Sequence, residues 1–247
     1  MNKIPSGYNP FRTHTVQVKS LLPRVATAAI GLPTLAVLVY IGGIWFSILV
    51  ALAASIGAFE LYKMARNNSL SPPLLVMLIW SLAPVAVTHI LSGDFSEDQS
   101  FKTYVVIAVI VYLVWQLHRS RSKVSWTNWG IATFTALYTG GLLSHAILLR
   151  DTAQGREWVY LAVLVAFATD TCAFFIGSTI GRKPLAPSIS PGKTWEGSVA
   201  GLVGGIIACL IISFSFGLNL SWSQAIALGA IVAIATQLGD LFESRIK

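Results

Sequence analysis

Charged residues are scarce in this sequence, and their scarcity excludes most classes of soluble protein. Only 11% of the 247 residues are charged, whereas 55% are hydrophobic and the mean hydropathy is +0.70. About a quarter of the residues in an average soluble domain carry a charge. A water-soluble fold of this length cannot hide so much apolar surface, so a soluble enzyme or a secreted module is excluded.

Cysteines and acidic residues are also few. The two cysteines, Cys172 and Cys209, both lie in apolar runs, which excludes a disulfide framework. Ten acidic residues stand against 17 Lys and Arg residues, and the net charge is +7. In a soluble protein this balance would suggest nucleic acid. In so apolar a chain, positive cytoplasmic loops explain it, and we expect no nucleic acid as a partner.

Long apolar runs make up most of the chain, and a membrane-spanning helix needs about 20 residues. The runs lie roughly at 25–41, 44–63, 73–92, 103–117, 130–149, 158–180, 197–216 and 222–244. They predict an all-α fold, a polytopic membrane helical bundle with about eight transmembrane helices. We expect residues 1–24 to form a basic N-terminal arm in the cytoplasm and residues 25–247 to form a single membrane-embedded domain.

Lys and Arg residues gather on one side of this predicted bundle. With a cytoplasmic N-terminus, 14 of the 17 fall in inside segments, and only Lys102, Arg150 and Arg156 fall outside. Positive residues concentrate in the cytoplasmic loops of membrane proteins. We therefore expect an integral membrane protein, of a bacterial inner or plasma membrane, with both termini cytoplasmic.

Acidic residues within or at the ends of the runs need a reason, because a charge inside a span is costly. They are Glu60, Asp170, Glu196, Asp240 and Glu243. Asp170 falls within the sixth run and shares a helix face with Ala173 and Gly177, and glycines of the seventh run form a matching stripe. Small residues let helices approach closely, so the sixth and seventh runs are expected to pack together with Asp170 near the seam.

Asp240 and Glu243 lie one helical turn apart near the end of the eighth run. Two carboxylates at this spacing suit a hard divalent cation, which prefers oxygen ligands. The same spacing also suits a solvated helix end in which Lys247 pairs with Glu243. The spacing by itself leaves both interpretations open.

The predicted cytoplasmic loop at 181–197 combines three prolines, three cations and three hydroxyl side chains, and Glu196 begins the next run. Its Gly-Lys-Thr at 192–194 is like the end of a P-loop, but that motif requires a glycine at position 187, which is Pro, and a preceding strand. The free N–H groups of a helix N-terminus favour anions. The loop therefore predicts a phosphate-bearing ligand, with an ordinary positive-inside loop as the alternative.

Three segments together resemble a known family. They read Ser-Pro-Gly-Lys-Thr-Trp-Glu-Gly at 190–197, Leu-Ala-Pro at 185–187 and Gly-Asp-Leu-Phe-Glu-Ser at 239–244, and they resemble phosphatidate cytidylyltransferase, also called CDP-diacylglycerol synthase. The stretch at 170–177 resembles that family's intramembrane Asp segment. The resemblance implies a nucleotidyltransferase of phospholipid biosynthesis that joins CTP to phosphatidate, releases pyrophosphate and uses Mg²⁺ as its divalent cation.

The resemblance also implies roles for single residues. The expected catalytic residues are Asp240, Asp170 and Lys193. The expected metal ligands are Asp240, Glu243 and Asp170. The expected substrate-binding residues are Ser190, Thr194, Glu196, Lys183 and Arg182.

Members of this family continue past the position of Lys247 with another loop and span, which carry a His-Gly-Gly sequence and further metal ligands. We therefore expect little or no transfer by a 247-residue chain alone. The alternatives are a CTP-dependent lipid-alcohol kinase, a cation transporter that binds ions through its intramembrane acids, and a catalytically inactive truncated member. The sequence leaves a homodimer open.

Overall fold

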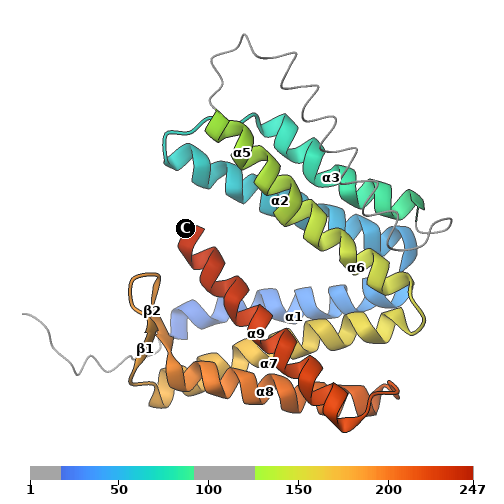
Figure 1. Ribbon diagram of the computed structural model, residues 1–247, viewed down its shortest axis with the longest axis vertical. Coiled ribbons are helices and arrows are strands. Elements are labelled where there is room, and N and C mark those ends of the chain that lie inside the picture. The colour runs from blue at the N-terminus through green and yellow to red at the C-terminus, as the bar shows by residue number, and fades with distance from the viewer. Residues whose placement is uncertain (1–17, 92–125, 247) are drawn as a thin grey trace, which may run out of the picture. The chain divides into compact units, whose positions relative to one another are not determined.

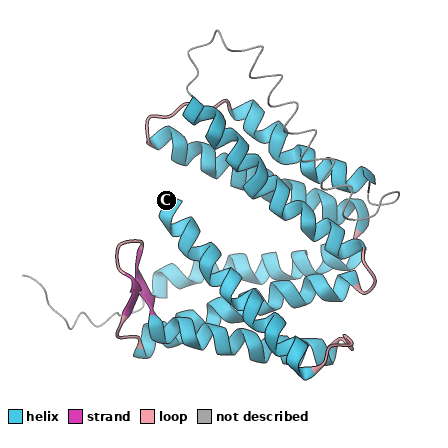
Figure 2. Cartoon of the chain, in the orientation of Figure 1, coloured by secondary structure: helices cyan, strands magenta, loops and turns pink. Residues whose placement is uncertain are grey.

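The computed structural model describes residues 18–91 and 126–246, which are almost entirely helical (Figures 1 and 2). The helices are α1 (Val18–Ile41), α2 (Gly43–Asn67), α3 (Leu74–Leu91), α5 (Trp126–Thr135), the π-helix η1 (Ala136–Gly141), α6 (Leu142–Asp151), α7 (Gly155–Ile180), α8 (Trp195–Ser215) and α9 (Trp222–Ile246). Two short strands, β1 (Pro184–Ala186) and β2 (Ser190–Thr194), lie between α7 and α8. The chain divides after Val37 into two compact units. The described part of the first unit is α1 up to Val37, and the remaining elements belong to the second.

Helices coincide with seven of the eight predicted apolar runs. The remaining run, the fourth, at 103–117, lies outside the described residues, as do most of the predicted basic arm and Lys247. Five helical segments are long and apolar enough to cross a membrane, namely Gly43–Asn67, Thr127–Asp151, Gly155–Ile180, Trp195–Ser215 and Trp222–Ile246. The apolar segments Ile30–Ile41 and Leu74–Ile90 are shorter. An all-α membrane protein is thus confirmed, and the total of about eight spans stays a prediction.

Large apolar side chains cover the outside of the spanning helices. Phe214 of α8 is 88% exposed and Trp222 at the start of α9 is 77% exposed. Acyl chains are as apolar as these side chains, so burying them between helices would bring little gain. Close packing of small residues is therefore expected to hold the helices together.

Glycines of α8 provide such packing against α7. A Cβ added at Gly197 would lie 2.7 Å from the carbonyl oxygen of Ala173, and one at Gly201 would lie 2.9 Å from the carbonyl oxygen of Thr169. Neither helix backbone can move aside without breaking its own packing, so only glycine permits this approach. The predicted seam between the sixth and seventh runs is confirmed.

Helices α2 and α3 pack against the π-helix η1 in a second group of close contacts. The buried Thr139 of η1 donates a hydrogen bond to Ser81 Oγ of α3, at 3.0 Å. Gly140 lies so close to the carbonyl group of Ser81 that a Cβ would not fit. The chain thus approaches α3 closely at the π-helical turn η1. This turn lies inside a run that the sequence analysis treats as a single span.

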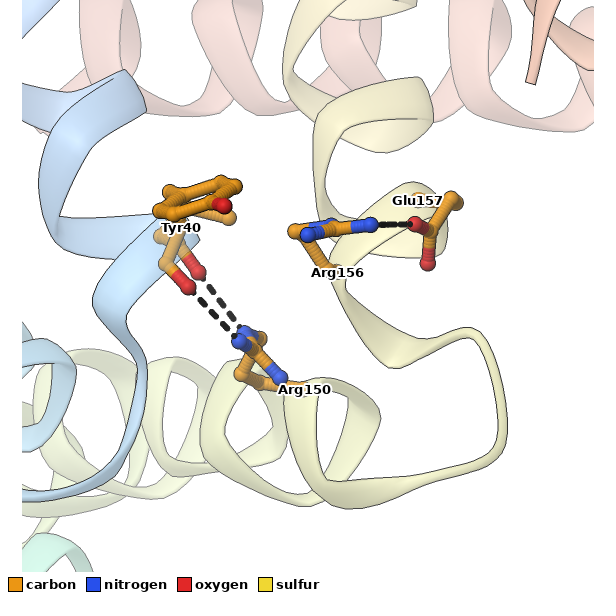
Figure 3. Close-up of polar contacts among 5 residues, drawn as sticks. Tyr40, Arg150, Arg156 and Glu157 are labelled. Carbon is orange, nitrogen blue, oxygen red and sulfur yellow. Dashed lines mark hydrogen bonds and ion pairs between the residues drawn. The ribbon is translucent and has the colours of Figure 1, made fainter.

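Two arginines tie the start of α7 and the end of α6 to the end of α1 (Figure 3). Arg150 donates from Nε to the carbonyl oxygen of Val39 at 2.8 Å, and from a terminal nitrogen to that of Tyr40 at 3.2 Å. These carbonyls belong to the last turn of α1, where backbone acceptors lack helical partners. Arg156 lies over the ring of Tyr40 and binds Glu157 at 2.6 Å. We call this group of residues the arginine end of α7.

Candidate functional site

A β-hairpin stands where the sequence analysis predicts only an irregular loop. Strands β1 and β2 are antiparallel, with Pro184 opposite Thr194 and Ala186 opposite Ser190. Prolines in both strands have no backbone N–H to donate, which limits the ladder to a few residues. The absence of a strand was one reason for rejecting a P-loop, and that reason is corrected here. The other reason stands, since position 187 is Pro.

The base of the hairpin is fastened to the first turn of α8. Thr194 caps this helix, because its hydroxyl oxygen accepts a hydrogen bond from the backbone N–H of Gly197 at 3.2 Å. The carboxylate of Glu196 accepts from the backbone N–H groups of Arg182 at 3.1 Å and Lys183 at 3.2 Å. An acid in the first turn also interacts favourably with the helix dipole. Glu196 therefore holds both ends of the 181–197 segment together.

A pocket of about 410 Å³ opens beside this hairpin. Its walls come from α7, both strands, and the facing ends of α8 and α9. It is lined by Asp170, Ala173, Phe174, Gly177, Ser178, Leu185, Gly192, Lys193, Thr194, Gly197, Ser198, Gln237 and Asp240. A volume of this size suits a small-molecule ligand.

Opposite charges meet across this pocket. Lys193 Nζ of β2 lies 2.6 Å from Asp240 Oδ2 of α9. Asp170 of α7 lies near enough to both of them to interact electrostatically. Two carboxylates and one ammonium group from three separate elements thus face the same space.

A reciprocal pair of hydrogen bonds sets the position of α9 beside the pocket. Ser198 Oγ donates to Gln237 Oε1, and Gln237 Nε2 donates to the carbonyl oxygen of Ser198 at 3.1 Å. Gln237 lies one turn before Asp240, on the same face of α9. The pair therefore fixes how far Asp240 projects toward the hairpin.

The donor set fits a magnesium ion only together with a ligand. Within the described ranges, no three His, Cys, Asp or Glu side chains come together as a metal site. Asp170 and Asp240 are the two carboxylates that line the pocket. Proteins usually hold Mg²⁺ with one or two carboxylates, while substrate phosphates and water complete its octahedron. The pocket therefore suits Mg²⁺ that is bound together with phosphate groups.

The structure brings some of the predicted site residues together and separates others. Asp170, Lys193, Thr194 and Asp240 all line the pocket. The expected substrate-binding residues Ser190, Arg182, Lys183 and Glu196 are not among its lining residues. Ser190 pairs with Ala186 in the hairpin. A substrate-binding role for these four residues stays a prediction.

Glu243 lines a second pocket, of about 440 Å³, together with Glu60 of α2. The π-helical residues Tyr138 and Thr139 form another wall of that pocket. Asp240 and Glu243 therefore face two different spaces, although they are one turn apart on α9. Glu243 as a ligand of the same metal ion as Asp240 stays a prediction.

Three polar residues of the first pocket do not figure among the predicted site residues. They are Ser178 of α7, Ser198 of α8 and Gln237 of α9. Helical spacing was the available signal, because Ser178 lies two turns after Asp170, Ser198 one turn after Thr194 and Gln237 one turn before Asp240. Spacing identifies such residues only after the charged residues beside them have been assigned to one site.

Comparison with known proteins gives one consistent result. The profile of the Cytidylyltransferase family matches residues 22–247. A phosphatidate cytidylyltransferase of Bacillus subtilis is 26% identical over 227 residues, which are 91% of this chain and 83% of the relative. One of Mycobacterium bovis is 29% identical over 90% of this chain and 74% of the relative. Chloroplastic phosphatidate cytidylyltransferase 4 of Arabidopsis thaliana is 33% identical over 88% of this chain and 61% of its own length.

Proposed function

Because the chain belongs to the cytidylyltransferase family, we propose that it transfers the cytidylyl group of CTP to phosphatidate. A phosphate oxygen of phosphatidate attacks the α-phosphorus of CTP. The bond from that phosphorus to the bridging oxygen of the β-phosphate breaks, and the electron pair leaves with pyrophosphate. The lipid product is CDP-diacylglycerol. The protein is thus a nucleotidyltransferase of phospholipid biosynthesis.

The observation that carries the proposal is the meeting of Lys193, Asp240 and Asp170 in one pocket. Transfer of a phosphoryl-type group needs positioning and charge neutralisation more than covalent chemistry. Lys193 binds the phosphates of CTP, and the Thr194 hydroxyl donates a hydrogen bond to them while its oxygen accepts the capping bond from Gly197 of α8. Asp240 and Asp170 would hold Mg²⁺, and the bound ion would supply positive charge that neutralises the phosphates.

The α7 wall of the pocket supports a lipid as the acceptor. Phe174 lines the pocket beside Ser178 and is half exposed, and its neighbour Phe175 is also exposed. Acyl chains of phosphatidate would lie along this aromatic face, while its phosphate reaches the charged residues. A pocket with one polar and one apolar side suits a substrate built in the same way.

The finer architecture belongs to the same proposal. We place both termini in the cytoplasm, with about eight spans, so that the hairpin and its pocket meet cytoplasmic CTP. Thr152 and Ser188 allow a test, because Thr152 lies in the turn before α7 and Ser188 lies in the turn of the hairpin that follows α7. In a variant without Cys172 and Cys209, a membrane-impermeant thiol reagent applied from outside should label Thr152→Cys but not Ser188→Cys. Labelling of Ser188→Cys alone would reverse the orientation.

The position of a radioactive phosphorus tests the reaction itself. Membranes are prepared with the protein in a form that includes the loop and span expected after Lys247, which we call the full-length protein. Given phosphatidate, these membranes should move label from [α-³²P]CTP into lipid and leave the label of [γ-³²P]CTP in pyrophosphate. Membranes without the protein are the control. A lipid-alcohol kinase would instead move the γ-label into lipid when given a lipid alcohol. Transfer of neither label would remove both enzymatic functions and leave the cation transporter and the catalytically inactive member.

A further inference from the structure

Lys193 and Asp240 form an ion pair with each other in the structure. Their ion pair measures 2.6 Å and joins the hairpin to α9 across the mouth of the pocket. The Lys193 side chain is only 23% exposed, so it depends on a partner for its charge, whereas the Asp240 side chain is 53% exposed. A metal ion bound at Asp240 would repel an ammonium group held 2.6 Å from the same carboxylate, so this contact loosens when a phosphate and a metal ion are bound.

We propose that the Lys193–Asp240 ion pair is a latch that makes nucleotide and divalent cation bind together. The proposal rests on the proposed function, because it assigns the phosphates of CTP to Lys193 and the cation to Asp240. A nucleotide without metal would take Lys193 and leave Asp240 facing its phosphates. A metal ion alone would take Asp240 and leave Lys193 beside a second positive charge. Only the two together replace the broken ion pair with two favourable contacts.

The latch can open by side-chain movement alone. The base of the hairpin keeps its bonds from Arg182 and Lys183 to Glu196, and the backbone N–H of Trp195 donates to the carbonyl oxygen of Lys183 at 2.9 Å. Gln237 and Ser198 independently hold α9 beside α8. Neither anchor includes Lys193 or Asp240, so both backbones stay in place while the two side chains exchange partners.

The latch predicts an unusual effect of a substitution. Asp240→Asn removes the partner of Lys193 and leaves its ammonium group available to a nucleotide. We expect Asp240→Asn to bind metal-free CTP about fivefold more tightly than the wild type, since a partly exposed ion pair contributes up to about a factor of five. A metal ligand that is not paired with Lys193 would change metal-free binding less, through the general effect of its lost charge alone.

Equilibrium binding of radiolabelled CTP to the purified full-length protein, in EDTA and without lipid, measures this effect. Loss of any negative charge near the phosphates would also favour binding, and two variants control for that. Asp170→Asn removes a carboxylate that lines the same pocket and should tighten binding less than Asp240→Asn. In a Lys193→Met background, Asp240→Asn should tighten binding no more than Asp170→Asn does, because no latch is left to open and only the general effect of the lost charge remains.

Two results would overturn the latch: no tightening by Asp240→Asn, or the same tightening with and without Lys193. Asp240→Ala gives the same measurement if the Asn variant does not fold. Binding of CTP with Mg²⁺ to the wild type separates the latch from the proposed function. If the wild type binds CTP with Mg²⁺ but the variants do not behave as expected, only the latch proposal is refuted. If the wild type does not bind CTP with Mg²⁺, the proposed function and the latch proposal are both refuted.

Discussion

Positively charged side chains lie near both ends of α7, but they have different roles there. At the arginine end, Arg150 is held by two backbone carbonyls of α1, and Arg156 is held by Glu157 and the ring of Tyr40. At the other end of α7, Lys193 meets Asp240 across a pocket. α7 has 26 residues and is therefore about 39 Å long, enough to place these ends on opposite sides of a bilayer core.

The two ends differ in whether a ligand can replace the partner of the positively charged side chain. A guanidinium group offers a rigid fork of donors, and backbone carbonyls are fixed acceptors that no ligand can replace. An ammonium group is a compact charge on a flexible stem, and a carboxylate partner can be exchanged for a phosphate. The arginine end therefore holds helices together, and the lysine end can bind and release a ligand.

The largest effect is expected from Asp240→Asn, which keeps the shape of the side chain and removes its charge. We expect transfer from CTP to phosphatidate by the full-length protein to fall at least about 100-fold, or about 2.7 kcal/mol, because Mg²⁺ loses a ligand. Incorporation of label from [α-³²P]CTP into lipid measures the loss. Asp151→Asn, at the exposed end of α6, is the matched control and should leave the rate unchanged. Near-normal activity of Asp240→Asn would remove it as a metal ligand.

The next effect concerns the charge of Lys193. Lys193→Ala should lower kcat/KM for CTP at least about tenfold, because a charge-assisted hydrogen bond to phosphate contributes about 1.5–3 kcal/mol. Lys193→Arg keeps the positive charge and should retain more activity than the alanine variant. Steady-state kinetics at varied CTP and saturating phosphatidate give the comparison. Unchanged kinetics in Lys193→Ala would reduce this lysine to a determinant of membrane orientation.

Arg150→Ala should damage stability and not chemistry. Losing two hydrogen bonds to the end of α1 is expected to lower the free energy of unfolding by about 2 kcal/mol. Thermal unfolding in detergent measures the loss, and the rate per folded molecule should stay at the wild-type value. Arg156→Ala should lower the unfolding temperature less, since its partner Glu157 lies beside it on the same turn. A large fall in the rate of folded Arg150→Ala would contradict a purely structural role.

The smallest effect separates two costs at neighbouring glycines. Gly42 and Gly43 both have positive φ, 69° and 52°, which L-residues rarely adopt. A Cβ at Gly42 would also lie 2.6 Å from the guanidinium group of Arg150, whereas one at Gly43 meets open space. Gly42→Ala should therefore be more destabilising than Gly43→Ala, by about 1 kcal/mol, and the difference should vanish in an Arg150→Ala background. If Gly42→Ala and Gly43→Ala lower the stability equally with and without Arg150, the Arg150 side chain moves aside from the added Cβ at no cost in free energy.

Apolar periodicity and small residues were enough to predict the helices and the α7–α8 seam. Hydrophobic runs locate spans because a bilayer leaves the backbone few alternatives to a helix. Gly197 and Gly201 on one run, with Ala173 and Gly177 on the other, identified which two helices approach closely. The pairing of Lys193 with Asp240 was less accessible, because no pattern within a single helix says which distant helix lies beside it.

The division between Asp240 and Glu243 could not be predicted from their spacing. Residues three apart on a helix differ by about 60° around its axis, which allows one shared site or two neighbouring ones. Helix α9 lies between two pockets, so the same turn presents Asp240 to one and Glu243 to the other. Similarly, Glu196 stood out as an acid at the start of an apolar run, but its bonds to the backbone of Arg182 and Lys183 depend on how the hairpin folds.

Among the described residues, the wall of the first pocket that the ribosome makes last is the one from α9. Helix α7, the hairpin and α8 emerge first, and α9 then brings Gln237 and Asp240. The chain is made from its N-terminus, so a nascent chain contains Lys193 before Asp240 has been made. Insertion of α9 into the membrane is therefore the step of biogenesis that brings Gln237 and Asp240 to the pocket, and a nascent chain halted before that step lacks a carboxylate that we assign to Mg²⁺.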